Sequence, residues 1–245
     1  MKLNVELDGS GPPLLLINGA RCTVRSWDHV VDDLARHFTV VRHDIRGTGR
    51  SPAGPADQYT FENYCQDIGD ICADHGFDRV SMWGMAWGAR VALVTAALQP
   101  ELVGRLVLSD LGIDPADPDA QRAGVLAARQ MRAAAGLIDT PKPEGSFDHD
   151  DPDEMLRAMA ATRLHHDLMP FVERVTAPTR LITGDHDPNL ASSRRALAGF
   201  QHRAVATELK VVEHAGHGVL FDRPGVVVEL ALGHLLGTGR SDTGQ

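Results

Sequence analysis

Short apolar runs alternate with segments of helical periodicity along most of this chain of 245 residues. The first two runs, residues 14–17 and 38–41, lie between loop-forming residues, a pattern typical of strands that are buried on both faces. Similar runs follow at residues 79–83, 105–109, 179–183 and 208–212. Strands that alternate with helices indicate parallel pairing, with helices on both faces of the sheet. The sequence therefore predicts an α/β protein with a doubly wound, mostly parallel sheet.

Most segments between the predicted strands space their apolar residues as helices do. The predicted helices cover residues 26–37, 61–75, 87–98, 193–200 and 224–236. This alternation stops at residues 111–175, which contain no convincing strand. Asp117-Pro118 and Asp151-Pro152 in this stretch have the N-cap and first-position residues of helices. We therefore expect one α/β core, made of residues 1–110 and 176–245, with a helical insertion over residues 111–175.

Composition argues against several classes of function. A net charge of -9 does not favour binding that depends on contacts to phosphates, so we expect no nucleic-acid partner. We also expect no membrane location or secretion, because no apolar stretch is long enough to span a bilayer and the N-terminus carries charged residues. The three cysteines form no metal-binding cluster, and their odd number fits free thiols in the cytoplasm. The sequence indicates neither a metal nor a cofactor, and it leaves the oligomeric state open.

A tight turn joins the strand at residues 79–83 to the helix that follows it. Its sequence, Gly84-Met85-Ala86-Trp87-Gly88, has the frame of the G-x-S-x-G motif with alanine at the centre. In that motif the glycines allow a sharp strand-to-helix turn that exposes the central side chain above the sheet. An ordinary glycine-rich turn is the alternative interpretation of so short a match. The rest of the chain decides between the two.

Two further candidates lie in loops after later strands. Asp187 follows the strand at residues 179–183, and His217 lies thirty positions beyond it, after the last predicted strand. Nucleophile, acid and histidine would then occur in the order that accompanies the G-x-S-x-G turn, at the sheet edge where such proteins bind ligands. Asp185 competes with Asp187 as the acid. The alternative for His217 is an ordinary surface histidine, since the chain has twelve histidines.

With these segments in order, the chain resembles the α/β-hydrolase superfamily over nearly its whole length outside the insertion. Residues 18–20, Asn-Gly-Ala, lie where the family usually carries His-Gly-x, and residues 44–51 and 216–224 look like two more of its loops. The resemblance implies the α/β-hydrolase fold, with residues 111–175 as a helical cap over the active site. The chain departs from the family at Asn18, which replaces the usual histidine, and at Ala86, which removes the nucleophile.

The resemblance implies a Ser-His-Asp mechanism centred on position 86. A hydroxyl there would attack an acyl carbon after His217 removed its proton, while Asp187 oriented the imidazole. The N–H groups of Ala20 and Trp87 would form the oxyanion hole. The implied substrate is a small apolar molecule with an ester or lactone group.

Two neighbouring residues are expected to contact that substrate. Met85 precedes the nucleophile position, and Arg21 follows the proposed oxyanion residue, where its guanidinium could bind a carboxylate through two hydrogen bonds. A solvated surface arginine is the simpler interpretation of Arg21. The sequence does not distinguish cleavage of an ester, a lactone or a C–C bond.

Ala86 has two explanations. A Ser→Ala substitution made to trap a substrate would leave the rest of the site in working order, and the retained acid, histidine and glycines favour this explanation. Alternatively, a natural protein has abandoned serine chemistry. Such a protein would use His217 and Asp187 as a general base in a lyase, isomerase or cofactor-independent oxygenase, or would bind a ligand without catalysis. Fold analogy does not decide between these functions.

Overall fold

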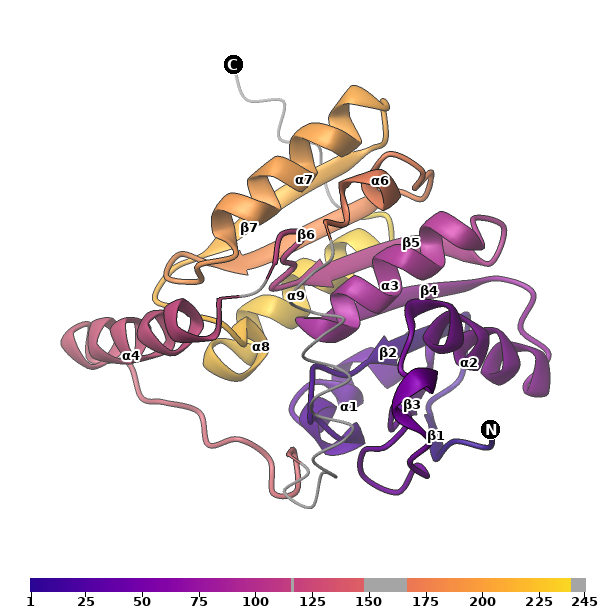
Figure 1. Ribbon diagram of the computed structural model, residues 1–245. Coiled ribbons are helices and arrows are strands. Elements are labelled where there is room, and N and C mark those ends of the chain that lie inside the picture. Colours follow the sequence, from indigo (N-terminus) through magenta and orange to yellow (C-terminus); the bar gives the residue numbers. More distant parts are fainter. Residues whose placement is uncertain (116, 148–166, 239–245) are drawn as a thin grey trace.

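The computed structural model describes residues 1–115, 117–147 and 167–238, and within them the strands form one seven-stranded sheet (Figure 1). The strands are β1 (Val5–Asp8), β2 (Pro13–Ile17), β3 (Thr39–His43), β4 (Val80–Met85), β5 (Val103–Ser109), β6 (Thr179–Gly184) and β7 (Thr207–Val212). Their order is β1-β3-β2-β4-β5-β6-β7. Only β1 pairs in the antiparallel direction, with β3, and the other pairs in this sheet are parallel. The predicted doubly wound, mostly parallel sheet is confirmed.

Strand β1 is absent from the sequence-based prediction. Its four residues, Val-Glu-Leu-Asp, are half polar, and Leu7 is largely exposed. The alternation of apolar and polar residues that predicts a strand is therefore weak in these four residues. The strand forms through backbone pairing with β3 in the register Val5↔His43. Pairing at the edge of a sheet requires little burial, so such a strand leaves little trace in the sequence.

Helices cover both faces of the sheet (Figure 1). The helices are α1 (Val31–Ala35), α2 (Phe61–Asp74), α3 (Trp87–Leu98), α4 (Pro118–Ala134), α6 (Met169–Val172), α7 (Leu190–His202), α8 (Val219–Asp222) and α9 (Pro224–Leu235), with short 3-10 helices η1 (Val24–Trp27) and η2 (Ala56–Gln58). Alternate residues of β2 belong to two separate cores: Leu15 packs with α2, α3, α6 and α7, whereas Leu14 packs with α1, α8 and α9. This two-sided burial explains why β2 is apolar at successive positions.

The prediction of one continuous helix over residues 26–37 is wrong. The structure has two short helices there, η1 and α1. Trp27, the last residue of η1, is fully buried against Trp83, with ring centroids 5.2 Å apart. Packing of this indole takes precedence over the local helical periodicity.

Helix α4 lies outside the two helical layers, beside α8 (Figure 1). It begins as the sequence predicts, because the Asp117 side chain accepts hydrogen bonds from the N–H groups of Asp119 and Ala120. The second predicted helix start, at residues 151–154, lies outside the described residues. The division into a core and an insertion over residues 111–175 therefore stays a prediction.

Two further expectations concern location and redox state. Among the helices of the described ranges, none is both long and apolar enough to cross a bilayer. The three cysteines, Cys22, Cys65 and Cys72, are buried free thiols, as the sequence analysis expects.

Buried histidines should make the fold sensitive to acid. Burial lowers the pKa of both His43 and His234 from the ordinary value of 6.5 to about 4. Between these pH values the unfolded chain binds more protons than the folded one, so the free energy of unfolding should fall as the pH drops through this window. The His234→Gln variant keeps a hydrogen-bond donor for the Pro178 carbonyl, 3.1 Å away, and should show a shallower fall. Urea unfolding of both proteins at pH 7 and pH 4.5 measures this difference, and equal slopes would refute the assignment.

Candidate active site

The turn between β4 and α3 has the geometry of a strained elbow. Ala86, its central residue, has φ 51° and ψ −109°, a backbone conformation that alanine rarely adopts. A Cβ atom at Gly84 would lie 2.3 Å from the Gly88 carbonyl oxygen, and one at Gly88 would lie 2.1 Å from the Ile17 oxygen. Both glycines are therefore required by close backbone packing. The elbow is held in place from β5, because the Ala86 N–H donates to the Ser109 carbonyl at 2.8 Å.

A cavity of about 270 Å³ opens over this elbow. Its walls include five of the residues that the sequence analysis singles out: Ala20, Met85, Ala86, Trp87 and His217. Further walls come from residues that it does not single out, among them Asp110, Gln121, Lys142, Phe147, Asn189 and Phe221. The volume is close to the lower end of the range for small-molecule sites, roughly 300 Å³. A compact ligand fits such a space best.

Arg21 does not line this cavity. Its backbone has φ 60°, and its side chain is exposed, although the preceding residue, Ala20, is part of the cavity wall. The chain turns outward at this position. The expected contact between Arg21 and the substrate stays a prediction that this geometry does not favour.

The structure brings the predicted acid and histidine together. His217 Nδ1 lies 3.2 Å from Asp187 Oδ2 and 3.3 Å from Oδ1. The Asp187 side chain is fully buried, whereas that of His217 is 21% exposed. With a proton on Nδ1 directed at Asp187, the other ring nitrogen, Nε2, is free to accept a proton from a group in the cavity.

The competing acid, Asp185, has a different role. Its two carboxylate oxygens accept hydrogen bonds from the N–H groups of His214 and Ala215, each at 3.0 Å. These bonds shape the loop that leads to His217. Of the two candidates, Asp187 is the one that contacts the histidine.

The loop that carries Ala20 is fixed by Asn18, one of the two positions at which the sequence analysis finds a departure from the expected motifs. Asn18 is fully buried, and its Oδ1 accepts a hydrogen bond from Trp27 Nε1 at 2.6 Å. Its Nδ2 donates to the carbonyl oxygens of His43 at 2.9 Å and Cys22 at 3.3 Å. Asparagine therefore ties together three segments around the loop. Asparagine at this position is therefore compatible with a well-ordered loop around Ala20.

The candidate oxyanion donors both adjoin the cavity. Ala20 lies after β2, and Trp87 is the first residue of α3, where backbone N–H groups have no partner within the helix. Within the part of the chain that the structure describes, no backbone carbonyl accepts a hydrogen bond from either N–H group. Both groups are therefore available to an oxygen in the cavity.

Asp110 is a residue of the site that the sequence analysis misses. It follows β5, is completely buried and has φ 54°. The Val219 N–H lies 3.1 and 3.3 Å from its two carboxylate oxygens. Polar atoms of Asp110, Asp187 and His217 all lie within 4.8 Å of one another. Its position directly after a predicted strand, at the ligand-binding edge, is the signal that could have identified it.

The environment of Asp110 favours its protonated form. Burial raises its pKa well above the ordinary range, and the charge and hydrogen bond of Asp187 raise it further. In its protonated form Asp110 donates a hydrogen bond to Asp187, the residue that contacts His217.

Oxygen and nitrogen atoms in such a group could also bind a metal ion. Here these atoms already have partners: the Val219 N–H approaches both oxygens of Asp110, and His217 approaches both oxygens of Asp187. We therefore assign the group to hydrogen bonding. The absence of a metal and of a cofactor stays an expectation from the sequence.

The protonation of Asp110 should be visible in protein stability. Above the ordinary aspartate pKa of 3.8 the unfolded chain releases a proton that the folded chain retains, so this residue should lower the free energy of unfolding as the pH rises. The Asp110→Asn variant has no such proton and keeps a similar shape. Its stability relative to the parent should therefore increase between pH 5 and pH 8 in guanidinium unfolding. A difference that does not change with pH would show that Asp110 is ionised when folded.

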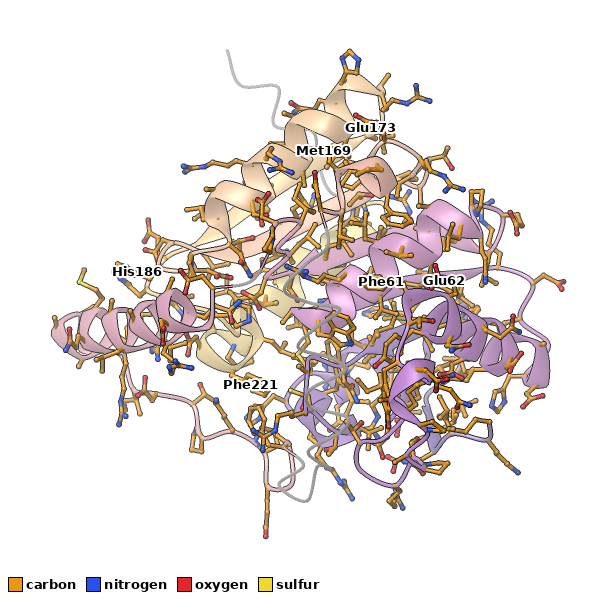
Figure 2. The ribbon with its side chains drawn as sticks, in the orientation of Figure 1. Phe61, Glu62, Met169, Glu173, His186 and Phe221 are labelled. Atoms are coloured by element: carbon orange, nitrogen blue, oxygen red, sulfur yellow. The ribbon has the colours of Figure 1, made fainter. Side chains whose placement is uncertain are left out.

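Helix α4 packs tightly on the loop that carries the histidine. Arg132 contacts Asp222 Oδ2 and donates to the His214 carbonyl, with both distances 2.9 Å. Asp222 in turn accepts a hydrogen bond from the Gly216 N–H at 2.9 Å. A Cβ atom at Gly124 would lie 2.3 Å from the His186 carbonyl oxygen, and His186 lies beside α4 in Figure 2. Helix α4 is therefore connected by these contacts to the loops that carry His186 and His217.

Comparisons with known proteins agree with the fold described above. A family model described as alpha/beta hydrolase fold matches residues 12–130. A soluble epoxide hydrolase of Corynebacterium sp. (strain C12) is 34% identical over 103 residues, which cover 42% of this chain and 36% of that protein. A fluoroacetate dehalogenase of Burkholderia sp. is 34% identical over 113 residues, which cover 44% of this chain and 37% of that protein. The chain thus aligns with about a third of the length of its curated relatives.

Solved structures match over a larger part of the chain. The crystal structure of the enol-lactonase from Burkholderia xenovorans LB400 has a TM-score of 0.76 at 22% identity and covers 96% of each chain. At this identity the likeness shows a shared fold. The relatives named above act on different bonds, so the fold does not specify a substrate.

Proposed function

Because this chain belongs to the α/β-hydrolase fold superfamily, we propose that it is a hydrolase of a carboxylic ester or lactone, with the nucleophilic serine replaced by alanine at position 86. The observation that carries this proposal is that His217, in contact with Asp187, lines the same cavity as the strained elbow at Ala86. Alanine at φ 51° offers no chemical benefit, whereas an elbow serine would. With alanine at position 86, the chain lacks the attacking oxygen.

The reaction follows from the position of each group. With serine at position 86, His217 Nε2 takes the hydroxyl proton as the oxygen attacks the substrate carbonyl carbon. The N–H groups of Ala20 and Trp87 stabilise the oxygen that becomes negative. Collapse of this intermediate breaks the bond to the alcohol oxygen, which receives the proton from His217.

Water completes the cycle. His217 takes a proton from water, whose oxygen attacks the acyl group, and the serine oxygen leaves and regains a proton. Asp187 stabilises the imidazolium in both halves of the reaction. Asp110 acts through Asp187 as a positioning residue, because its polar atoms lie within 4.8 Å of those of Asp187 and His217.

We infer that residues 111–175 act as a cap. Gln121, Lys142 and Phe147, from the described part of this stretch, line the same cavity as Ala86. Phe147 lies 5.5 Å from Phe221 of α8 between ring centroids, and Figure 2 labels Phe221 below α4. These rings give one side of the cavity an apolar surface for the body of a substrate.

The proposal is tested by restoring the hydroxyl. The Ala86→Ser variant should hydrolyse p-nitrophenyl acetate or butyrate, detected by absorbance, or a γ- or δ-lactone, detected by acid release in a pH-stat. A folded variant that turns over no ester and no lactone in this panel would refute the proposal.

A second candidate function uses the chain as it stands. The His217–Asp187 pair and the cavity are complete without a hydroxyl, so His217 could remove a proton from a carbon acid. This function requires exchange of an acidic C–H for deuterium in the unsubstituted protein, measured by NMR, and loss of this exchange in His217→Ala. Exchange that persists in His217→Ala would exclude it.

A further inference from the structure

Lys142 lies at the border between the active-site cavity and a second cavity, and it contributes to the walls of both. Its ammonium nitrogen is 4.7 Å from the centroid of the Phe147 ring and 4.9 Å from that of Phe221. Two aromatic faces within this distance attract a cation and restrict its position. The charge is therefore held at the cavity, although the side chain is exposed.

The two acidic residues in the wall of the second cavity, Asp139 and Asp222, pair with arginines. Asp139 pairs with Arg132 at 2.7 Å and with Arg129 at 3.2 Å, and Asp222 pairs with Arg132 at 2.9 Å. Across residues 1–115, 117–147 and 167–238, no carboxylate oxygen lies within the 4.0 Å of an ion pair from Lys142 Nζ. Among the described residues, the Lys142 charge is thus left without a carboxylate partner.

The positive charge of Lys142 also acts electrostatically on Cys22, a residue of the cavity wall close to the elbow. Burial raises the pKa of the Cys22 thiol to about 11, and the charge of Lys142 opposes this increase. Cys22 lines the cavity next to Gly19, and a Cβ atom at Gly19 would lie 3.3 Å from Cys22 Sγ and 3.8 Å from Ala86 Cβ. Lys142 therefore contributes positive potential within the space where a substrate would bind.

We infer that the substrate of this site carries a carboxylate, which Lys142 binds while the apolar part lies against Phe147 and Phe221. This inference rests on the proposed function, because it assigns the substrate class of the same cavity. It changes two expectations from the sequence: the substrate is amphipathic rather than simply apolar, and Lys142 takes the role considered for Arg21. An ester or lactone that also bears a free carboxylate has this chemistry.

A binding experiment on the unsubstituted protein tests this inference without any catalysis. Phenylacetate and phenylacetamide have nearly the same shape and differ in charge, and both are small enough for the cavity. Isothermal titration calorimetry should give a lower Kd for phenylacetate. The Lys142→Met variant should weaken phenylacetate binding by about three- to tenfold and leave phenylacetamide unchanged, and added NaCl should reduce the difference between the two ligands.

Two matched variants separate charge from other effects. Lys142→Arg retains the charge and should retain most of the preference for phenylacetate. Lys2→Met removes a charge from an exposed residue outside the cavity walls and should change neither affinity. Equal Kd values for the two ligands, no saturable binding of phenylacetate, or an unchanged preference in Lys142→Met would each overturn the inference.

Kinetics distinguish failure of this inference from failure of the proposed function. In the Ala86→Ser background, Lys142→Met should raise KM for mono-p-nitrophenyl glutarate and leave kcat nearly unchanged, with little effect on p-nitrophenyl valerate. If Ala86→Ser is inactive while Lys142-dependent binding persists, the hydrolase proposal fails and the anion site stands. If both esters react alike with and without Lys142, the hydrolase proposal stands and the anion site fails.

Discussion

The Ala86→Ser variant is expected to hydrolyse p-nitrophenyl esters on the order of 10³-fold faster than the unsubstituted protein, with an initial burst of nitrophenol. The expected gain is large because one missing oxygen separates the chain from a complete constellation. The elbow already has φ 51°, and His217 is already in contact with Asp187. Stopped-flow absorbance measures the burst, whose amplitude should equal the concentration of active protein.

Ala86→Gly is the matched control for this gain. Glycine adopts positive φ without steric cost, so this variant should be at least as stable as the parent and should remain inactive. It changes the same backbone position without supplying a nucleophile. Activity in Ala86→Gly equal to that in Ala86→Ser would show that the hydrolysis does not depend on the new hydroxyl.

In the Ala86→Ser background, Asp187→Asn should lower kcat by roughly 10⁴-fold, the loss seen when the acid of a Ser-His-Asp triad becomes an amide. The amide places an N–H where His217 now has a carboxylate, so the imidazole proton moves to the wrong nitrogen. His217→Ala should cause a loss of similar or larger size. Steady-state kinetics with a p-nitrophenyl ester measure both effects.

Asp185→Asn provides the comparison that separates catalysis from folding. Asp185 accepts two backbone hydrogen bonds and does not contact the His217 ring in the described structure. Its substitution should lower Tm and change kcat far less than Asp187→Asn does. Equal losses of kcat in the two variants would mean that the acid has been assigned wrongly.

Much of the fold could be predicted because burial leaves a strong periodic signal. The bounds of α3 agree with the predicted residues 87–98, since this helix is apolar and follows directly from the elbow. Strand β1 could not be predicted, because backbone pairing at the sheet edge forms it without much burial. Residues 26–37 form two helices because Trp27 packs against Trp83 on another strand, a contact that local periodicity does not encode.

The residues of the candidate site also fall into those that the sequence could predict and those that it could not. Ala86, Asp187 and His217 could be found because their order and their places after strands are properties of the sequence. Asp110 is missed although it directly follows a predicted strand, because its proximity to Asp187 is not a property of the local sequence. Lys142 could not be found, because its place between the rings of Phe147 and Phe221 depends on how the chain folds. The direction of the Arg21 side chain could not be predicted either. It depends on the backbone conformation of Arg21, which has a positive φ and leaves the side chain exposed, directly after Ala20.

The central claim is that position 86 is the nucleophile position served by His217, and covalent labelling tests it most directly. The Ala86→Ser variant is treated with ethyl p-nitrophenyl methylphosphonate, whose nitrophenolate leaves as the serine oxygen bonds to phosphorus, and intact mass and peptide mapping follow. The account predicts one phosphonyl group per chain at position 86, strongly reduced labelling in the Ala86→Ser/His217→Ala variant, and none at this position in the unsubstituted protein. A folded Ala86→Ser variant that remains unlabelled at position 86, or labelling there that does not depend on His217, would contradict it.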